Sequence, residues 1–175
     1  MGNHEMAELT GRTILKEGVV LNQVFANAVT ARYDGRGEEA MSAMKEFWRA
    51  LPLAARTANG VFISHSTPSR DFLDKFTSDV LSRPLESADF ARSGGAYALC
   101  WGRDFTPDIA DRFALLVGAQ FLVVGHTPCD DGFLTPNERH IVLDSQGPSG
   151  KYLLAPLEGN LTYAELVGRI RPLWG

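Results

Sequence analysis

The stretch Phe121-Leu122-Val123-Val124-Gly125-His126-Thr127-Pro128 decides the fold. Its four apolar residues predict a buried strand, and the Gly-His-Thr-Pro that follows predicts a loop. A second run, Val61-Phe62-Ile63-Ser64, also ends at a histidine, His65, which is followed by Ser-Thr-Pro. Because open α/β sheets place ligands and catalytic groups at the carboxyl edge of their strands, two histidines delivered there could meet at one metal ion.

Amphipathic or capped segments predict four helices around these strands. They cover 39–51, a segment from Ser69 through Val80, 106–118, and a segment that begins after Thr162. Two further runs, 140–143 and 152–154, predict strands. The linking Gly147-Pro148-Ser149-Gly150 predicts that these two strands form an antiparallel hairpin. The expected fold class is therefore α/β with a mixed sheet.

Composition narrows the kind of protein. The 175 residues are 45% hydrophobic and 22% charged, which fits a single globular domain and excludes a disordered tail. A net charge of -4 provides no basic footprint, so we expect neither nucleic acid nor an anionic membrane surface as a partner. Two cysteines, Cys100 and Cys129, are too few for a disulfide framework. The longest apolar run, 113–124, is too short to cross a bilayer, so we expect a cytoplasmic protein.

Two other histidines stand in different contexts. His4 lies in Gly2-Asn3-His4-Glu5, which suits a tight turn beside a metal and a phosphate. There Asn supplies a neutral oxygen ligand, His donates a proton to a leaving group, and Glu holds the turn. Taken by itself, this string is better interpreted as a polar turn near the N-terminus. His140 begins a strand beside Arg139, and we expect it on the surface.

In combination, Gly-Asn-His-Glu, a strand-end histidine and Gly-His-Thr-Pro occur in an order that resembles the second half of the metallophosphoesterase motif set. The chain is most similar to the phosphoprotein phosphatase (serine/threonine protein phosphatase) branch of these calcineurin-like enzymes, in its bacterial type. Phe47-Trp48, Leu51-Pro52-Leu53-Ala54-Ala55 and Leu99-Cys100-Trp101-Gly102-Arg103 match segments of that branch as well. The resemblance covers the C-terminal portion of the family domain.

The resemblance implies a four-layer αββα sandwich with mixed sheets and a centre of two divalent ions, manganese, iron or zinc. Asn3, His65 and His126 then bind one of the two ions. His4 is the general acid, and an activated hydroxide attacks phosphorus. Arg103 binds phosphate oxygens; its alternative role is a surface partner for Asp104. The implied substrate is a phosphorylated protein or a small phosphoester.

Two earlier family motifs, Gly-Asp-x-His and Gly-Asp-x-x-Asp-Arg-Gly, are not found in the sequence. We therefore expect residues 1–175 to be one N-terminally truncated domain without its N-terminal strands. At most one metal is then partly liganded, and activity of this chain alone is little or none. Ser66-Thr67 replaces the Gly-Gly that typically follows His65 in eukaryotic members. The substrate is thus open between phosphoproteins and dinucleoside polyphosphates.

Two other interpretations remain. The chain is alternatively a non-catalytic remnant that acts as a binding module on the same scaffold. A structural zinc site is the weaker option, in which Cys129, three residues after His126, serves as a ligand. The sequence does not determine the oligomeric state.

Overall fold

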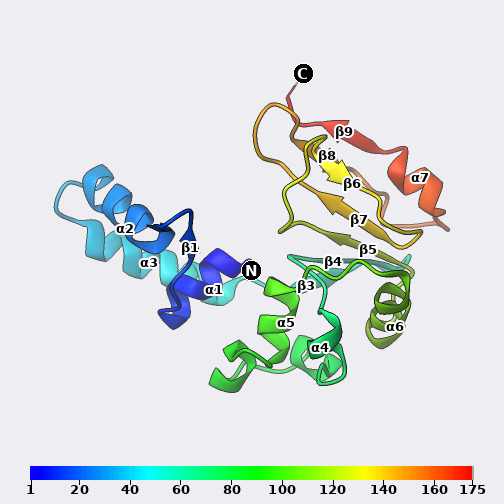
Figure 1. Ribbon diagram of the computed structural model, residues 1–175, viewed down its shortest axis with the longest axis horizontal. Coiled ribbons are helices and arrows are strands. Elements are labelled where there is room, and N and C mark those ends of the chain that lie inside the picture. The colour runs from blue at the N-terminus through cyan, green and yellow to red at the C-terminus, as the bar shows by residue number, and fades with distance from the viewer. Residues whose placement is uncertain (175) are drawn as a thin grey trace. The chain divides into compact units, whose positions relative to one another are not determined.

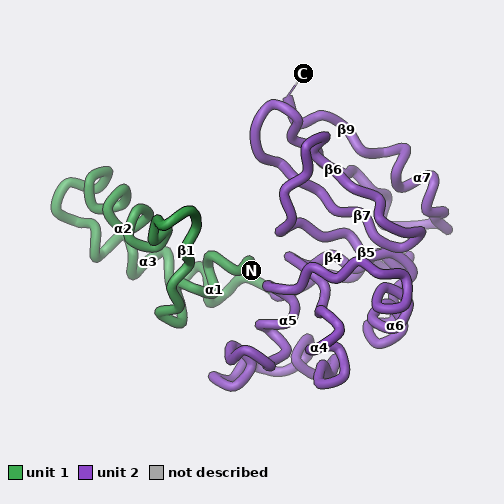
Figure 2. The backbone as a smooth tube through the Cα atoms, viewed as in Figure 1, with its two compact units in different colours: residues 1–52 green, residues 53–175 purple. Residues whose placement is uncertain are grey.

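The computed structural model describes residues 1–174. The chain divides into two compact units, Met1–Pro52 and Leu53–Gly175, coloured separately in Figure 2. The expectation of a single domain stays a prediction. Within the described residues, no helix is both long and apolar enough to cross a membrane.

The first unit contains three helices and one small hairpin. The elements are α1 (Asn3–Thr10), β1 (Leu15–Lys16), β2 (Val19–Val20), α2 (Leu21–Arg32) and α3 (Gly37–Ala50). The strands pair antiparallel, with Leu15 opposite Val20. Helices α2 and α3 approach closely at Gly37, where an added Cβ would lie 2.8 Å from the Thr30 Cα. Glycine at this position therefore permits the helix contact.

The second unit is built on a five-stranded mixed sheet (Figure 1). Its strands are β3 (Ala54–Arg56), β4 (Val61–Ser64), β5 (Phe121–Val124), β6 (Phe133–Leu134) and β7 (His140–Leu143). They are arranged in the order β3-β4-β5-β7-β6. The central strands β4, β5 and β7 are parallel, and the edge strands β3 and β6 are antiparallel to their neighbours. The predicted α/β class with a mixed sheet is confirmed.

Both faces of this sheet are covered, which is why β5 is buried along its whole length. On one face Phe62 packs edge-on against Phe113, which also contacts Phe76, at ring distances of 5.6 and 5.4 Å. The opposite face carries Val61, Phe121, Val123 and Ile141, which pack against Leu166. The remaining elements of the unit are α4 (Arg70–Leu73), η1 (Ser78–Leu81), η2 (Ser87–Phe90), α5 (Gly95–Trp101), α6 (Pro107–Val117), β8 (Lys151–Leu153), α7 (Tyr163–Val167) and β9 (Ile170–Pro172).

The capped helices agree well with expectation. Helix α6 has Thr106 at its N-cap and Pro107 in its first turn, and it ends at Gly118, whose φ of 62° is left-handed. Helix α7 has the expected capping box, in which Thr162 accepts from the Glu165 N–H and Glu165 accepts from the Thr162 N–H. Helix α3 covers nearly all of the predicted 39–51.

Several expectations were wrong. The helix predicted from Ser69 through Val80 breaks into α4 and η1. The predicted hairpin of 140–143 with 152–154 does not form, because β7 lies between β5 and β6 while β8 pairs with β9. Strand β7 is buried on both faces and so belongs in the sheet interior. The pattern of a single strand does not identify its neighbour.

The region 2–5, expected as a tight turn, opens a helix instead. Helix α1 begins at Asn3, and the Gly2 N–H donates to the Glu5 carboxylate at 2.8 Å. An acid three residues after the N-cap satisfies an N–H group that the helix itself leaves unpaired. Glu5 therefore caps a helix where we expected it to hold a turn.

Candidate functional site

His65 and His126 follow neighbouring parallel strands, β4 and β5. The strands are in register, with Val61 opposite Phe121, and the pairing continues beyond them where the Gly125 N–H donates to the His65 carbonyl at 3.0 Å. The imidazole centroids lie 4.9 Å apart. Nε2 of His65 lies 3.1 Å from Nδ1 of His126. The sheet thus brings the two histidines together, as the matching strand ends indicated.

The backbone of His126 is strained. Its φ is 64°, in the left-handed region that glycine tolerates and other L-residues rarely adopt. Such conformations persist only where the surroundings fix them, and they cluster at functional sites. The left-handed conformation of His126 turns the chain away from the direction of β5, at the point where its ring approaches that of His65.

Arg103 reaches the same place from the loop that follows α5. Its Nη2 donates to the His126 carbonyl at 3.4 Å, and its backbone N–H donates to the Ser69 hydroxyl at 3.4 Å. The alternative, in which Arg103 pairs with Asp104, receives no support, because the Asp104 carboxylate instead accepts from Thr106 and the Arg70 N–H. The exposed guanidinium beside His126 is suited to binding an anion.

Gly102 allows this approach. A Cβ at this residue would lie 1.7 Å from the Thr67 carbonyl oxygen, an impossible contact. The Gly102 N–H donates to the Ser66 hydroxyl at 3.1 Å, and the Ser66 N–H donates to the Leu99 carbonyl at 2.8 Å. These bonds fasten the end of α5 to the loop that follows His65.

Three buried polar atoms around the pair have no hydrogen-bond partner in the described part of the chain. They are Oγ1 of Thr67, Oγ1 of Thr127 and Nε1 of Trp101. Thr67 and Thr127 follow the two histidines closely in sequence, and the Trp101 ring meets the His126 ring edge-on at 6.3 Å. Buried polar groups are nearly always hydrogen-bonded, so these three atoms are available to a water molecule or a bound polar group.

The two histidine nitrogens fit a shared metal ion. Nitrogen ligands held at about 2.0–2.1 Å lie roughly 2.9–3.4 Å apart, depending on the coordination angle. The observed separation of 3.1 Å falls in that range and equally suits a hydrogen bond between one protonated and one bare nitrogen. Residues 1–174 contain no group of three or more His, Cys, Asp or Glu residues placed to hold a metal. Within this unit the donor set is therefore a histidine pair.

The two other predicted site residues lie in the first unit, at the start of α1. Asn3 is buried and His4 is exposed. Their roles as metal ligand and general acid stay predictions. The two sets of predicted residues thus belong to different compact units.

Cys129 forms hydrogen bonds through both its thiol and its backbone N–H. Its thiol donates to the Thr127 carbonyl at 3.2 Å, and its backbone N–H donates to Asp144 at 3.0 Å. Burial, with the nearby Asp144 and Asp130, raises the pKa of the Cys129 thiol. Among residues 1–174, Cys129 belongs to no group of three or more His, Cys, Asp or Glu residues placed to hold a metal, so the structural-zinc interpretation gains no support.

The expected position of His140 was wrong. We expected it on the surface, and it is completely buried. Asn137 accepts from the His140 N–H with its oxygen, and its amide nitrogen lies 3.2 Å from Nδ1 of His140. Nδ1 is thus the acceptor, which leaves the proton on Nε2, a buried atom without a partner among residues 1–174. Burial lowers the pKa of His140 to about 4, against a weaker opposing effect of Asp104.

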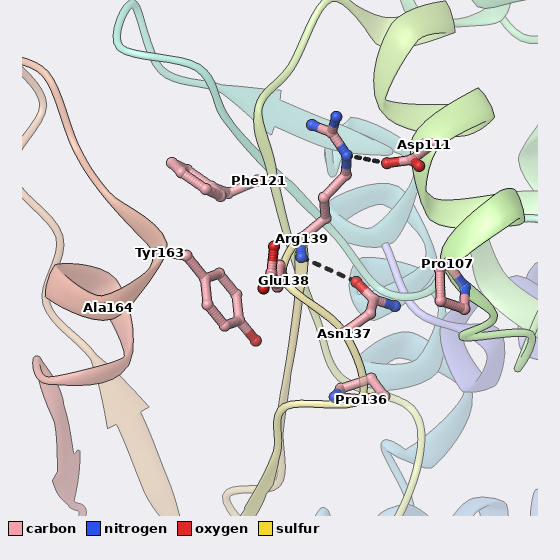
Figure 3. A pocket seen from close by; sticks show the side chains of 9 residues that line it. All are labelled: Pro107, Asp111, Phe121, Pro136, Asn137, Glu138, Arg139, Tyr163 and Ala164. Atoms are coloured by element: carbon pink, nitrogen blue, oxygen red, sulfur yellow. Dashed lines mark hydrogen bonds and ion pairs between the residues drawn. The ribbon is translucent and has the colours of Figure 1, made fainter.

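A pocket of about 790 Å³ lies beside Asn137, at the amino ends of β5 and β7 (Figure 3). Arg139 pairs with Asp111 at its rim, and the Arg139 N–H donates to the Asn137 oxygen at 2.9 Å. Phe121 begins β5, whereas His126 follows its end. This pocket is therefore at the opposite edge of the sheet from the histidine pair.

Reasoning from the sequence missed the orphaned polar atoms of Thr67, Thr127 and Trp101. The two threonines stand in the quoted motifs beside His65 and His126, which was the available signal. Nothing local in the sequence marks Trp101 as a neighbour of His126, because the contact depends on the path of α5.

Comparison with known proteins supports the fold. No protein-family model matches the sequence, and no curated protein matches it significantly. Among solved structures, a Saccharomyces cerevisiae protein serine/threonine phosphatase with similarity to human phosphatase PP5 is 18% identical, with a TM-score of 0.56, over 73% of this chain and 45% of its own.

Two structures of a cold-active protein tyrosine phosphatase, one of them a point mutant, match 87% of this chain. Their identities are 18% and 19%, and their TM-scores are both 0.55. The match covers 50% and 51% of those chains, so the present chain spans about half the length of the solved structures it matches. The chain has a phosphatase-like fold.

Proposed function

We propose that this chain belongs to a metal-dependent phosphoester hydrolase of the phosphoprotein phosphatase type. The observation that carries the proposal is the 3.1 Å approach of His65 and His126 at the carboxyl edge of β4 and β5, with Arg103 beside them. The phosphatase-like fold of the solved structures supports it. His65, Arg103 and His126 are far apart in the chain and come together only in the folded unit.

The residues have distinct roles in this proposal. His65 and His126 hold a divalent ion, manganese, iron or zinc, with neutral imidazole nitrogens. Such an ion, when bound, acts as a Lewis acid and lowers the pKa of water. Arg103 presents a planar, permanently charged fork that binds phosphate oxygens. The orphaned hydroxyls of Thr67 and Thr127 add polar contacts at the same edge.

The first unit contributes two further proposed roles. His4 is the general acid that protonates the leaving oxygen, and its exposure on α1 makes the ring accessible to a substrate. Asn3 supplies a neutral oxygen ligand to the metal. Both assignments come from the Gly-Asn-His-Glu motif.

Activity of this chain alone is expected to be low. A pair of neutral histidines binds metal more weakly than a cluster that includes carboxylates, and the described residues contain no larger His, Cys, Asp or Glu group. The substrate is a phosphorylated protein or a small phosphoester. If the chain binds neither metal nor phosphate, the binding-module interpretation gains ground.

The test combines metal content with turnover. Purified chain is dialysed against manganese or zinc, its bound metal is counted, and hydrolysis of p-nitrophenyl phosphate is followed at neutral pH. We expect metal binding that His65→Ala and His126→Ala each weaken, with hydrolysis slow but metal-dependent. Stoichiometric binding that survives both substitutions would contradict the assignment.

A further inference from the structure

A second cavity, of about 490 Å³, lies in the first unit and shares His4 with the predicted site residues. It opens between α1, the beginning of α2 and the end of α3, which are shown in blue to cyan in Figure 1. Its lining residues are His4, Glu5, Glu8, Leu21, Asn22, Phe25, Met44, Phe47 and Trp48. All nine belong to Met1–Pro52, so the cavity is a property of this unit.

Aromatic rings form one wall of the cavity. The rings of Phe25 and Trp48 are 6.0 Å apart and inclined by 47°. Phe47 is 64% exposed and Phe25 38% exposed, so substantial aromatic surface meets solvent. The face of an aromatic ring carries partial negative charge and attracts cations, Trp most strongly.

Two carboxylates of α1 line the cavity, and one oxygen of each accepts a hydrogen bond from a neighbouring residue. Oε2 of Glu5 accepts from the Gly2 N–H at 2.8 Å. Oε1 of Glu8 accepts from Nδ2 of Asn22 at 2.7 Å. Each carboxylate keeps a second oxygen that these bonds do not use. The cavity thus presents acceptors whose positions are set before any ligand arrives.

The charged side chains that line the cavity are acidic. Among the described residues that line it there is no lysine or arginine, so its own wall does not neutralise Glu5 and Glu8. An anion is disfavoured by both the carboxylates and the ring faces. A cation with an apolar stem matches both, because the stem covers the rings while the charged head meets the carboxylates.

We propose that this cavity binds an arginine or lysine side chain of a peptide. Arginine suits it better, since a guanidinium stacks on aromatic faces and donates several hydrogen bonds to carboxylates. The exposure of Phe47 and Phe25 leaves one side of the cavity open to solvent, where the main chain of a peptide can continue.

The position of His4 connects this cavity to the reaction. His4 lines the cavity and is, in the proposed function on which this step rests, the proton donor to the leaving group. With His4 in that role, a basic side chain seated against Trp48 belongs to the substrate itself. The substrate class is then a phosphopeptide with a neighbouring basic residue, in preference to a dinucleoside polyphosphate.

The test measures peptide binding without requiring turnover. A short labelled peptide with one arginine, unphosphorylated, is titrated with the chain and followed by fluorescence anisotropy. A second peptide with glutamine in place of arginine is the ligand control. We expect the arginine peptide to bind more tightly, and Glu8→Gln to weaken it by about fivefold or more, in line with a partly desolvated charge and cation–π contact.

Glu8→Gln is a conservative change, because its amide oxygen can still accept from Asn22 and hold the α1–α2 contact. Glu46→Gln is the matched control: it removes the same charge from an exposed position of the same unit that does not line the cavity. Trp48→Leu should also weaken binding, and circular dichroism checks that each variant is folded. Equal affinity of both peptides, or equal effects of Glu8→Gln and Glu46→Gln, would overturn the proposal.

Three more outcomes separate the possibilities. If N-acetylarginine amide binds as tightly as the peptide, the occupant is a small organic cation and the peptide assignment fails. If arginine-dependent binding persists in a chain that hydrolyses no phosphoester, the cavity stands and the proposed function fails. If the chain hydrolyses p-nitrophenyl phosphate but has no preference for arginine-containing phosphopeptides, the substrate assignment fails.

Discussion

Nε2 of His65 lies 3.1 Å from Nδ1 of His126, although 61 residues separate them in the chain. Parallel pairing of β4 with β5 produces this approach, since both histidines leave the sheet at the same edge. If both nitrogens bind one ion, removing either should cost the same affinity. We expect His65→Ala and His126→Ala to weaken zinc binding to a similar extent, at least about tenfold, measured by titration against a competing chelator.

His140→Asn is the control for that comparison. It removes a histidine at the amino end of β7, away from the histidine pair at the carboxyl edge, and the new side-chain amide can still form a hydrogen bond with Asn137. It should leave zinc affinity unchanged. Loss of affinity in one histidine variant and not in the other would show that the pair does not act as a shared ligand set.

The left-handed backbone of His126 makes a prediction about stability. Because alanine at φ 64° carries a conformational cost that glycine does not, His126→Gly should be more stable than His126→Ala by about 1 kcal/mol. Urea unfolding without added metal measures the difference. Equal stability of the two variants would mean that the strain is relieved elsewhere.

Gly102 should tolerate no side chain. A Cβ there would lie 1.7 Å from the Thr67 carbonyl oxygen, so Gly102→Ala should lower the free energy of unfolding by about 3 kcal/mol and displace Arg103. Gly125→Ala is the matched control, since its Cβ would meet its nearest atom at 3.6 Å, an ordinary contact. Thermal unfolding of the two variants, followed by circular dichroism, makes the comparison.

Substitution of Arg103 should weaken phosphate binding more than metal binding. Arg103→Lys keeps the charge and loses the planar fork, so the inhibition constant of inorganic phosphate should rise several-fold while zinc affinity stays unchanged. Inhibition of p-nitrophenyl phosphate hydrolysis gives the first quantity and chelator competition gives the second. Equal losses in both would place Arg103 in metal binding.

Burial of His140 predicts acid sensitivity. Its folded pKa of about 4 is below the unfolded value of 6.5, so the unfolded chain takes up the proton first as the pH falls. The stability associated with neutral His140 is present above pH 6.5 and is lost as the pH falls toward 4. The loss is up to about 3 kcal/mol.

Urea unfolding at a series of pH values between 7 and roughly 4 tests this prediction. His140→Asn cannot titrate, so its stability should fall less over the same range. A parallel decline in both proteins would assign the acid sensitivity to other groups, such as the Asp89–Arg83 pair, in which Arg83 lowers the pKa of the Asp89 carboxyl.

Local sequence determined those elements whose ends carry their own chemistry. Helix α6 is specified by Thr106, Pro107 and Gly118, and α7 by the reciprocal bonds of Thr162 with Glu165. Helix α2 and helix α5 were missed, because α2 lacks a polar N-cap side chain, beginning after Val20, and α5 begins at a pair of glycines. Ser69 does stand at the N-cap of α4, but α4 ends at Leu73, so this cap residue marked where a helix begins and not how long it is.

The candidate site divides in the same way. His65 and His126 were identified from the sequence, because the apolar runs show where each strand ends and therefore which residue follows its carboxyl end. The partnership of Trp101 with His126, and the burial of His140, depend on which elements pack together across long separations in the chain.

The sequence by itself therefore determined the α/β class, the capped helices and the two histidines that close the central strands. Tertiary structure alone decided the strand order, the left-handed turn at His126, the buried state of His140 and the aromatic, acidic cavity of the first unit. The physical reason is that caps and periodicity act between near neighbours in the chain. Burial, strand neighbours and the shape of a cavity arise only when distant segments exclude water from one another.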